Sequence, residues 1–250
     1  MYKKYFEGKK AAFFDLDGTI IDTSKICIDA MQKVLNDDHA SYINAKEYRI
    51  NGYPMRTFWE MILDVNDLGP DKKLDDYVKL TEDAYIETVK KSGLIPTEGF
   101  WPFVYELKEE KGYKLALVTN TRKGVADVLI DKLGLREVFD LIICGDEVKK
   151  LKPDPEIYKK ALKELKVNPK EVIVFEDSIS GVTAAAKAKI DIIVIWDKVT
   201  PKYLFPGKIF EYVPDFSAFP GHMDETFTEF VKRSATEIDE ARKQLQKSKA

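Results

Sequence analysis

Short apolar runs recur along the chain, and each one ends in a polar residue. Five such runs, rich in Val, Ile, Leu or Phe, are separated by longer amphipathic stretches: AAFF (11–14), KLALVTN (114–120), DLIICGD (140–146), EVIVFED (171–177) and DIIVIWD (191–197). Continuous apolar runs of this length are typical of strands that are buried on both faces. The pattern therefore predicts five buried strands.

Helical patterns lie between the later runs, at 122–133, 155–166 and 180–188. Strands that alternate with helices predict an α/β fold, here a Rossmann-like parallel sheet core with helices on both faces. In such a sheet, ligands bind beyond the carboxyl ends of the strands. We therefore expect the polar residues that end the runs to lie along one edge of the sheet.

The interval after the first run differs, because no strand pattern appears between Thr23 and about Gly93. Turn-forming stretches separate three helical patterns there, which cover 23–36, 55–65 and 72–91. We interpret this interval as an inserted α-helical bundle that forms a cap over the sheet.

The last stretch of the chain is strongly charged and carries apolar residues at roughly helical spacing. A C-terminal helix that packs on the core is the simpler interpretation, and a contact between two copies of the chain is the alternative, so a homodimer stays open. The predicted domains are a discontinuous core at 1–20 and 96–220, a helical cap at 21–95 and a C-terminal helical tail at 221–250.

Composition narrows the expected partners of this chain of 250 residues. A formal net charge of −3 gives no overall basic field, so nucleic acid is not an expected partner. Cys27 and Cys144 belong to no CxxC pair, which argues against a disulfide framework or a zinc site. The first apolar stretch is too short for a signal peptide or a membrane span, so we expect a cytoplasmic protein with no membrane partner.

Residues that can do chemistry follow four of the predicted strands. In chain order these are Asp15 and Asp17, then Thr119 and Asn120, then Lys149, Lys150 and Lys152, and finally Glu176, Asp177 and Ser178. Carboxylates that gather at one place repel one another and need a cation. Oxygen ligands without a nearby His or Cys favour Mg²⁺. A lysine and hydroxyl groups beside Mg²⁺ suit a phosphoryl group.

Asp15 and Asp17 are two residues apart, so on a strand their side chains face the same way. One carboxylate can attack phosphorus to form an aspartyl phosphate, while the other protonates the leaving alcohol and then activates water. Taken singly, each of the polar residues has a plain structural interpretation as a turn former, a helix cap or a surface lysine. Their joint occurrence after four strands of one sheet favours a phosphoryl-transfer site.

The motifs DLDGT (15–19), TN (119–120), KPDP (152–155) and EDS (176–178) match, in order, the four motifs of the haloacid dehalogenase superfamily. The inserted helices resemble the cap of its phosphoglycolate phosphatase and β-phosphoglucomutase-like subfamily. The stretch FEYVPDFSAF, at 210–219, resembles the family's last strand and the turn after it. The resemblance implies a Mg²⁺-dependent phosphatase that hydrolyses a phosphomonoester of a small metabolite through an aspartyl phosphate.

The resemblance also implies roles for individual residues. Asp15 would be the nucleophile and Asp17 the general acid and base. Thr119 and Lys152 would bind the phosphoryl group, with Asn120 beside them.

The implied Mg²⁺ site draws on the same aspartates. The ion would bind Asp15, the backbone carbonyl of Asp17, and Asp177, with Glu176 as a further ligand or a support.

In the cap, NGYPMR (51–56) resembles a G-x-P-x-R pattern of many phosphatases in the subfamily. Arg56 and Tyr53 could then reach a substrate group away from the phosphate, and an arginine there suits a carboxylate or a second phosphate. A surface arginine on a cap helix is the alternative interpretation of Arg56.

Two other functions compete with a phosphatase. A β-phosphoglucomutase-like phosphosugar mutase would carry a histidine twelve residues after the nucleophile, where this chain has Cys27. A non-enzymatic receiver-like signalling module also combines an acidic Mg²⁺ site, a phosphorylated aspartate, a threonine and a lysine. Receivers, however, carry the phosphorylated aspartate on a middle strand of the chain and have no cap. Dehalogenases of the superfamily lack the second aspartate, so dehalogenation is not expected.

Overall fold

The computed structural model describes residues 3–40, 43–45, 55–66, 68 and 72–219. Six strands pair in parallel and form one sheet in the order β3-β2-β1-β4-β5-β6. Their bounds are β1 Ala11–Phe14, β2 Lys114–Val118, β3 Leu141–Ile143, β4 Val172–Glu176, β5 Asp191–Ile195 and β6 Ile209–Val213. The predicted α/β fold with a parallel sheet is confirmed.

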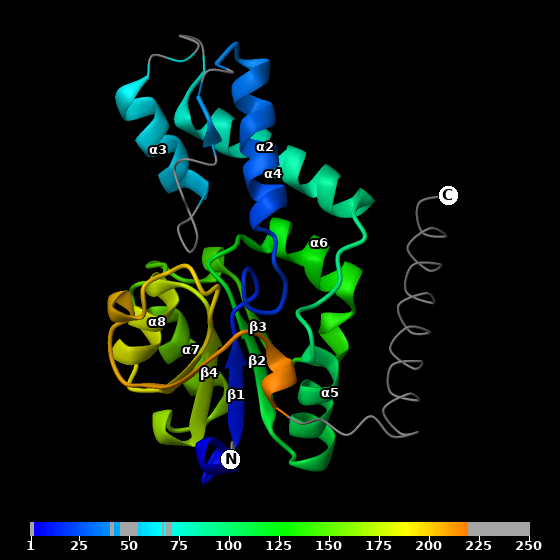
Figure 1. Cartoon of the computed structure of the whole chain (residues 1–250), viewed down its shortest axis with the longest axis vertical. Helices are drawn as coiled ribbons and strands as arrows, with labels where there is room; N and C mark the ends of the chain where they lie inside the picture. The colour runs from blue at the N-terminus through cyan, green and yellow to red at the C-terminus, as the bar shows by residue number, and fades with distance from the viewer. Residues whose placement is uncertain (1–2, 41–42, 46–54, 67, 69–71, 220–250) are drawn as a thin grey trace.

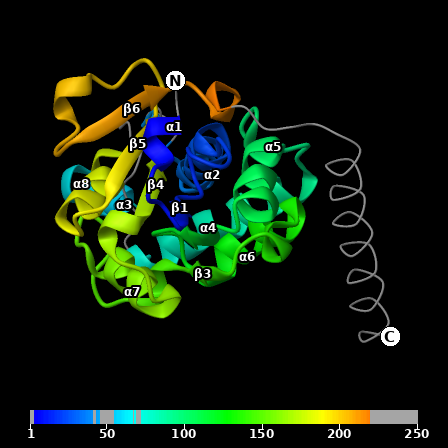
Figure 2. The ribbon, with the colours of Figure 1, turned by 90° about the horizontal axis from the view of Figure 1, so that it is seen from below.

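The central strand β1 is completely buried and divides the core into two layers. Ala11 and Phe13 pack in the cluster that includes helices α7 (Glu156–Leu165) and α8 (Ile179–Lys187). Ala12 and Phe14 pack on the other side, in the cluster that includes α5 (Phe100–Tyr105) and α6 (Lys123–Leu133). Figure 2 shows these two pairs of helices on opposite sides of the sheet. The alternation of β1 therefore buries one helical layer on each face.

The α5 segment was not predicted as a helix from the sequence. It continues into a π-helical turn at Glu106–Glu110, and its apolar side chains join an aromatic cluster at the sheet. Phe103 lies 5.3 Å from Phe175 between ring centroids, and Phe14 stacks on Phe175 at 4.8 Å. Such aromatic contacts stabilise a helix of less than two turns that would be marginal on its own.

Three helices lie between β1 and α5 in the described part of the chain: α2 (Ser24–Asp37), α3 (Met55–Val65) and α4 (Leu74–Lys91). We call them the inserted helices. They share a hydrophobic cluster that is separate from the two sheet clusters, and the rings of Trp59 and Tyr77 stack in it at 4.8 Å. Figure 1 shows them beyond the end of the sheet opposite the N-terminus, at the carboxyl ends of the strands.

The division into core, cap and tail stays a prediction. The proposed tail at 221–250 lies outside the described residues. Within the part of the chain that the structure describes, no helix combines the length and the apolar character needed to cross a membrane.

Candidate active site

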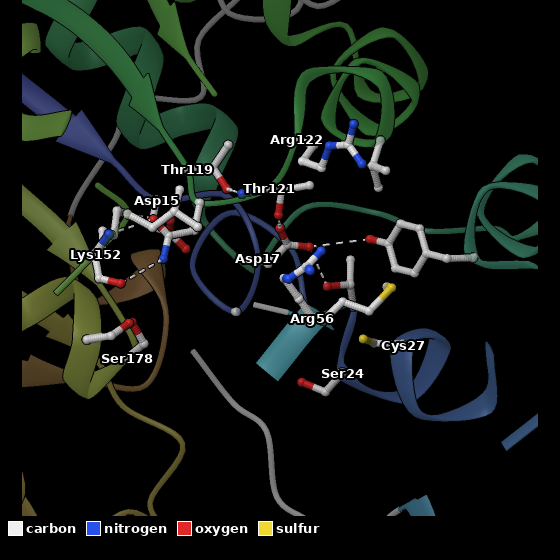
Figure 3. A pocket seen from close by; sticks show the side chains of 18 of the residues that line it. Asp15, Asp17, Ser24, Cys27, Arg56, Thr119, Thr121, Arg122, Lys152 and Ser178 are labelled. Atoms are coloured by element: carbon white, nitrogen blue, oxygen red, sulfur yellow. Dashed lines mark hydrogen bonds and ion pairs between the residues drawn. The ribbon is translucent and has the colours of Figure 1, made fainter. Parts of the chain in front are cut away.

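A cavity of about 400 Å³ lies between the carboxyl edge of the sheet and the inserted helices. Residues that follow four strands, β1 to β4, line it, as the sequence predicted for a parallel sheet. The residues in question are Asp15, Asp17, Thr119, Asn120, Lys152 and Asp177. Figure 3 shows Asp15 beside Lys152 at one side of this cavity and Asp17 beside Thr121.

Lys152 holds the carboxylates together from a position that is almost fully buried. Its ammonium donates to Asp15 Oδ1 at 2.6 Å and to Glu176 Oε1 at 2.7 Å, and also to the backbone carbonyl of Val118 at 2.7 Å. Burial works to lower the pKa of the Lys152 ammonium, but Asp15 and Glu176 outweigh it and raise the pKa. Lys152 is therefore a permanent cation at the end of β2 and β4.

The carboxylates outnumber this cation. Asp15, Glu176 and Asp177 each offer an oxygen within 4.8 Å of the others. Burial raises the pKa of Asp15 to about 7, against the lowering effect of Lys152. The pKa of Asp177 is also raised, by burial and then by Asp15 and Glu176. Three crowded carboxylates with one ammonium and only oxygen donors fit a hard divalent cation such as Mg²⁺.

Glu176 accepts more hydrogen bonds from side chains than Asp15 or Asp177 does. Besides the Lys152 ammonium, it accepts the hydroxyl of Tyr158 at 2.7 Å and that of Ser178 at 3.2 Å. Asp177 accepts the hydroxyl of Thr19 at 3.2 Å. The fully buried Glu176 therefore suits the supporting role, and Asp15 and Asp177 suit direct binding of a cation.

Gly18 lets the chain turn tightly between Asp17 and the inserted helices. Its φ is +84°, and a Cβ at this position would overlap the carboxylate of Asp177. Only glycine can combine this conformation with so close an approach.

We expect Gly18→Ala to lower the free energy of unfolding by more than Gly8→Ala does. Gly8 has a similar φ of +72°, but a Cβ there would meet nothing within 4 Å. The control therefore measures the conformational cost alone, about 1–2 kcal/mol, and Gly18→Ala adds the overlap with Asp177. Urea unfolding of both variants measures the difference. Equal losses would mean that Asp177 moves aside freely.

Asp17 is held by hydroxyl groups from three separate segments. Its Oδ1 accepts from Thr23 at 2.6 Å and from Tyr85 of α4 at 3.3 Å, and its Oδ2 accepts from Thr121 at 2.7 Å. Figure 3 shows these contacts as dashed lines that converge on Asp17. The inserted helices thus contact the predicted general acid directly.

Thr119 and Asn120 lie at the end of β2 but have different surroundings. The hydroxyl oxygen of Thr119 accepts the N–H of Thr121 at 3.0 Å, which directs its own hydrogen elsewhere. Asn120 binds the backbone of Lys152 twice, accepting its N–H at 2.9 Å and donating to its carbonyl at 3.2 Å. Thr119 therefore suits a phosphate ligand, whereas Asn120 fixes the loop that carries Lys152.

The sequence predicted two substrate residues in the cap, and the structure describes one of them, Arg56. Arg56 lines the cavity, but its guanidinium pairs with Asp75 at 2.5 Å and with Glu60 at 3.3 Å. Tyr53 lies outside the described residues. The roles of both residues in substrate binding stay predictions.

Several residues of the site were not singled out from the sequence. They are Thr23, Glu82, Tyr85, Thr121, Arg122 and Tyr158. Thr121 directly follows the TN motif, which is a usable signal. Tyr85 and Tyr158 lie on amphipathic helices, where spacing alone makes them look like ordinary core residues.

A sequence model of haloacid dehalogenase-like hydrolases matches residues 12–195, which includes all four strand-end motifs. The chain belongs to this family. This hydrolase is 32% identical to a phosphorylated carbohydrates phosphatase from Thermotoga maritima, over 73% of its own chain and 82% of the relative.

Two further relatives widen the range of activities in the family. The hydrolase is 28% identical to a fructose-1-phosphate phosphatase from Escherichia coli, over 76% of its chain and 96% of the relative. The crystal structure of a putative beta-phosphoglucomutase from Thermotoga maritima is 31% identical, with a TM-score of 0.67, and the match covers 82% of this chain and 94% of that one.

Proposed function

We propose that this hydrolase is a Mg²⁺-dependent phosphatase that acts on a phosphomonoester of a small metabolite through an aspartyl phosphate. One observation carries the proposal: the Asp15 carboxylate, bound to the buried Lys152 ammonium, shares a cavity with an Asp17 carboxylate that three hydroxyls orient. The phosphatases among its relatives support the same reaction class.

The reaction would run in two displacements at phosphorus. In the first, an Asp15 oxygen bonds to phosphorus, the bond to the leaving oxygen breaks, and Asp17 gives that oxygen a proton. In the second, Asp17 takes a proton from water, whose oxygen attacks phosphorus and releases Asp15 and inorganic phosphate. Lys152 and Thr119 would hold the phosphoryl oxygens during both steps.

Mg²⁺ would be held by Asp15, Asp177 and the backbone carbonyl of Asp17, and it would supply positive charge to the phosphoryl oxygens. The inserted helices would serve as a cap that keeps bulk water from the cavity. A cavity of about 400 Å³ favours a small metabolite as the substrate.

A phosphosugar mutase is the nearest alternative, because one similar structure is named a putative beta-phosphoglucomutase. The observation against it is Cys27, which lines the cavity at the position where the resembled mutases carry a histidine. Burial, with a contribution from Asp17, raises the pKa of the Cys27 thiol to about 12. A thiol that stays protonated at neutral pH cannot replace histidine as a proton acceptor.

We expect the purified protein to release phosphate from phosphorylated metabolites with Mg²⁺, and to lose this activity in EDTA. The three crowded carboxylates provide the physical reason for the metal requirement. The release of inorganic phosphate is measured on a panel of phosphomonoesters, with an aryl phosphate as a generic substrate. Full activity in EDTA would contradict the metal assignment. Isomerisation of a sugar phosphate without release would favour a mutase, and uptake of one phosphate per chain without turnover would favour a receiver-like module.

A further inference from the structure

Glu82 and Arg122 form an ion pair at the cavity, in a part of it that the phosphoryl chemistry does not use. Arg122 Nη1 lies 3.4 Å from both carboxylate oxygens of Glu82. Glu82 comes from α4 of the inserted helices, and Arg122 precedes α6 of the sheet layer. The Glu82 side chain is only 18% exposed, so its charge acts within the cavity wall.

The position of this pair relates it to the leaving group. Glu82 precedes Tyr85 by three residues on α4, so the two side chains share one face of the helix. The Tyr85 hydroxyl contacts Asp17, and Arg122 directly follows Thr121, whose hydroxyl contacts the same carboxylate. Asp17 would protonate the leaving oxygen. The group attached to that oxygen would therefore extend toward the Glu82–Arg122 pair.

The described cations around this cavity are already paired with carboxylates. Among the described residues that line it, the cations are Arg56, Arg122 and Lys152. Each one pairs with at least one carboxylate, as Lys152 does with Asp15 and Arg122 with Glu82. A second anionic group on the substrate would meet the Glu82 carboxylate without an unpaired described cation to offset it.

We propose that Glu82 selects substrates whose non-phosphate part is uncharged and carries hydroxyl groups, as in a phosphorylated polyol or sugar. The inference rests on the proposed phosphatase function and deepens it. A hydroxyl can donate to the Glu82 carboxylate and accept from the Arg122 guanidinium. At 3.4 Å the two contacts of the pair are longer than a close charge-assisted hydrogen bond, so a hydroxyl can replace them at little cost. A carboxylate in the same place is repelled by Glu82.

Two small phosphomonoesters test this inference, since they differ mainly in charge. They are 2-hydroxyethyl phosphate, with a neutral hydroxyl, and 2-phosphoglycolate, with a carboxylate. We expect kcat/KM of the wild type to be at least about tenfold higher for the hydroxyl compound. Glu82→Gln removes the negative charge and keeps the shape of the side chain. It should therefore shift the ratio of the two kcat/KM values by about tenfold toward 2-phosphoglycolate, mainly through a lower KM for that compound.

Asp83→Asn is the matched control. It removes the same charge one residue further along α4, from a side chain that is 59% exposed and pairs with Lys79. It should leave the substrate ratio unchanged. p-Nitrophenyl phosphate serves as a generic substrate for all three proteins, because its aromatic group carries neither a carboxylate nor an alcohol hydroxyl that could meet Glu82.

The outcomes distinguish the proposed phosphatase function from the proposed role of Glu82. A wild type that favours 2-phosphoglycolate, or a ratio that is unchanged in Glu82→Gln, would overturn the role of Glu82 while p-nitrophenyl phosphate hydrolysis upholds the phosphatase. An equal shift in Asp83→Asn would mean that any charge on α4 has this effect, which also overturns it. If none of the three compounds is hydrolysed, the phosphatase function is overturned and the inference with it.

Discussion

Asp15→Asn is expected to lower kcat/KM for phosphate release by about 10⁴-fold or more, because the amide that replaces the carboxylate is not a competent nucleophile. The substitution preserves the size of the side chain and its place beside Lys152. It also removes one of three crowded carboxylates, so the variant should be at least as stable as the wild type in EDTA. Loss of activity without loss of stability would separate catalysis from folding.

Rapid acid quench with labelled substrate identifies the phosphorylated residue. Wild type should show a transient phosphoenzyme, and Asp15→Asn should show none. Asp17→Asn should keep its label, since it lacks the base that activates water for the second step. Asp15→Ala guards against slow deamidation of the introduced Asn back to Asp. Label on the chain of either Asp15 variant would show that another residue accepts the phosphate.

The sequence predicted the location of the site better than its inner contacts. Parallel strands end at one edge, so apolar runs that end in polar residues were sufficient to bring Asp15, Thr119 and Asp177 to one cavity. The α5 helix escaped prediction because its six residues make less than two turns and depend on aromatic packing at the sheet.

The contacts that orient the reacting groups could not be predicted, because they join distant residues. Tyr85 is 68 positions from Asp17, and Tyr158 is 18 positions from Glu176. No periodicity in the chain encodes which hydroxyl on an amphipathic helix meets which carboxylate. Likewise, the resemblance of NGYPMR to a phosphatase pattern was compatible with Arg56 as a substrate ligand but gave no sign of its pairing with Asp75.

Lys152→Met is expected to abolish phosphate release and to lower the free energy of unfolding at pH 8 by about 3–5 kcal/mol. Methionine fills a similar volume but leaves Asp15 and Glu176 buried without their cation. Lys150→Met, at an exposed position two residues earlier, is the control. It should change neither phosphate release nor the free energy of unfolding appreciably. Urea unfolding in EDTA at pH 8 and pH 6 measures the free energy of unfolding of both variants and of the wild type.

The pH dependence follows from Asp15, whose pKa is about 7 when Lys152 is present and Mg²⁺ is absent. Lys152 lowers this pKa, so its removal raises it further, and Asp15 in the variant takes up a proton more readily as the pH falls. A protonated Asp15 needs no cation. The loss of stability should therefore be smaller at pH 6 than at pH 8. Adding Asp15→Asn to Lys152→Met should restore part of the lost stability and none of the activity. A loss that is equal at both pH values and is not relieved in the double variant would mean that packing of the methionine, rather than the buried charge, sets the cost.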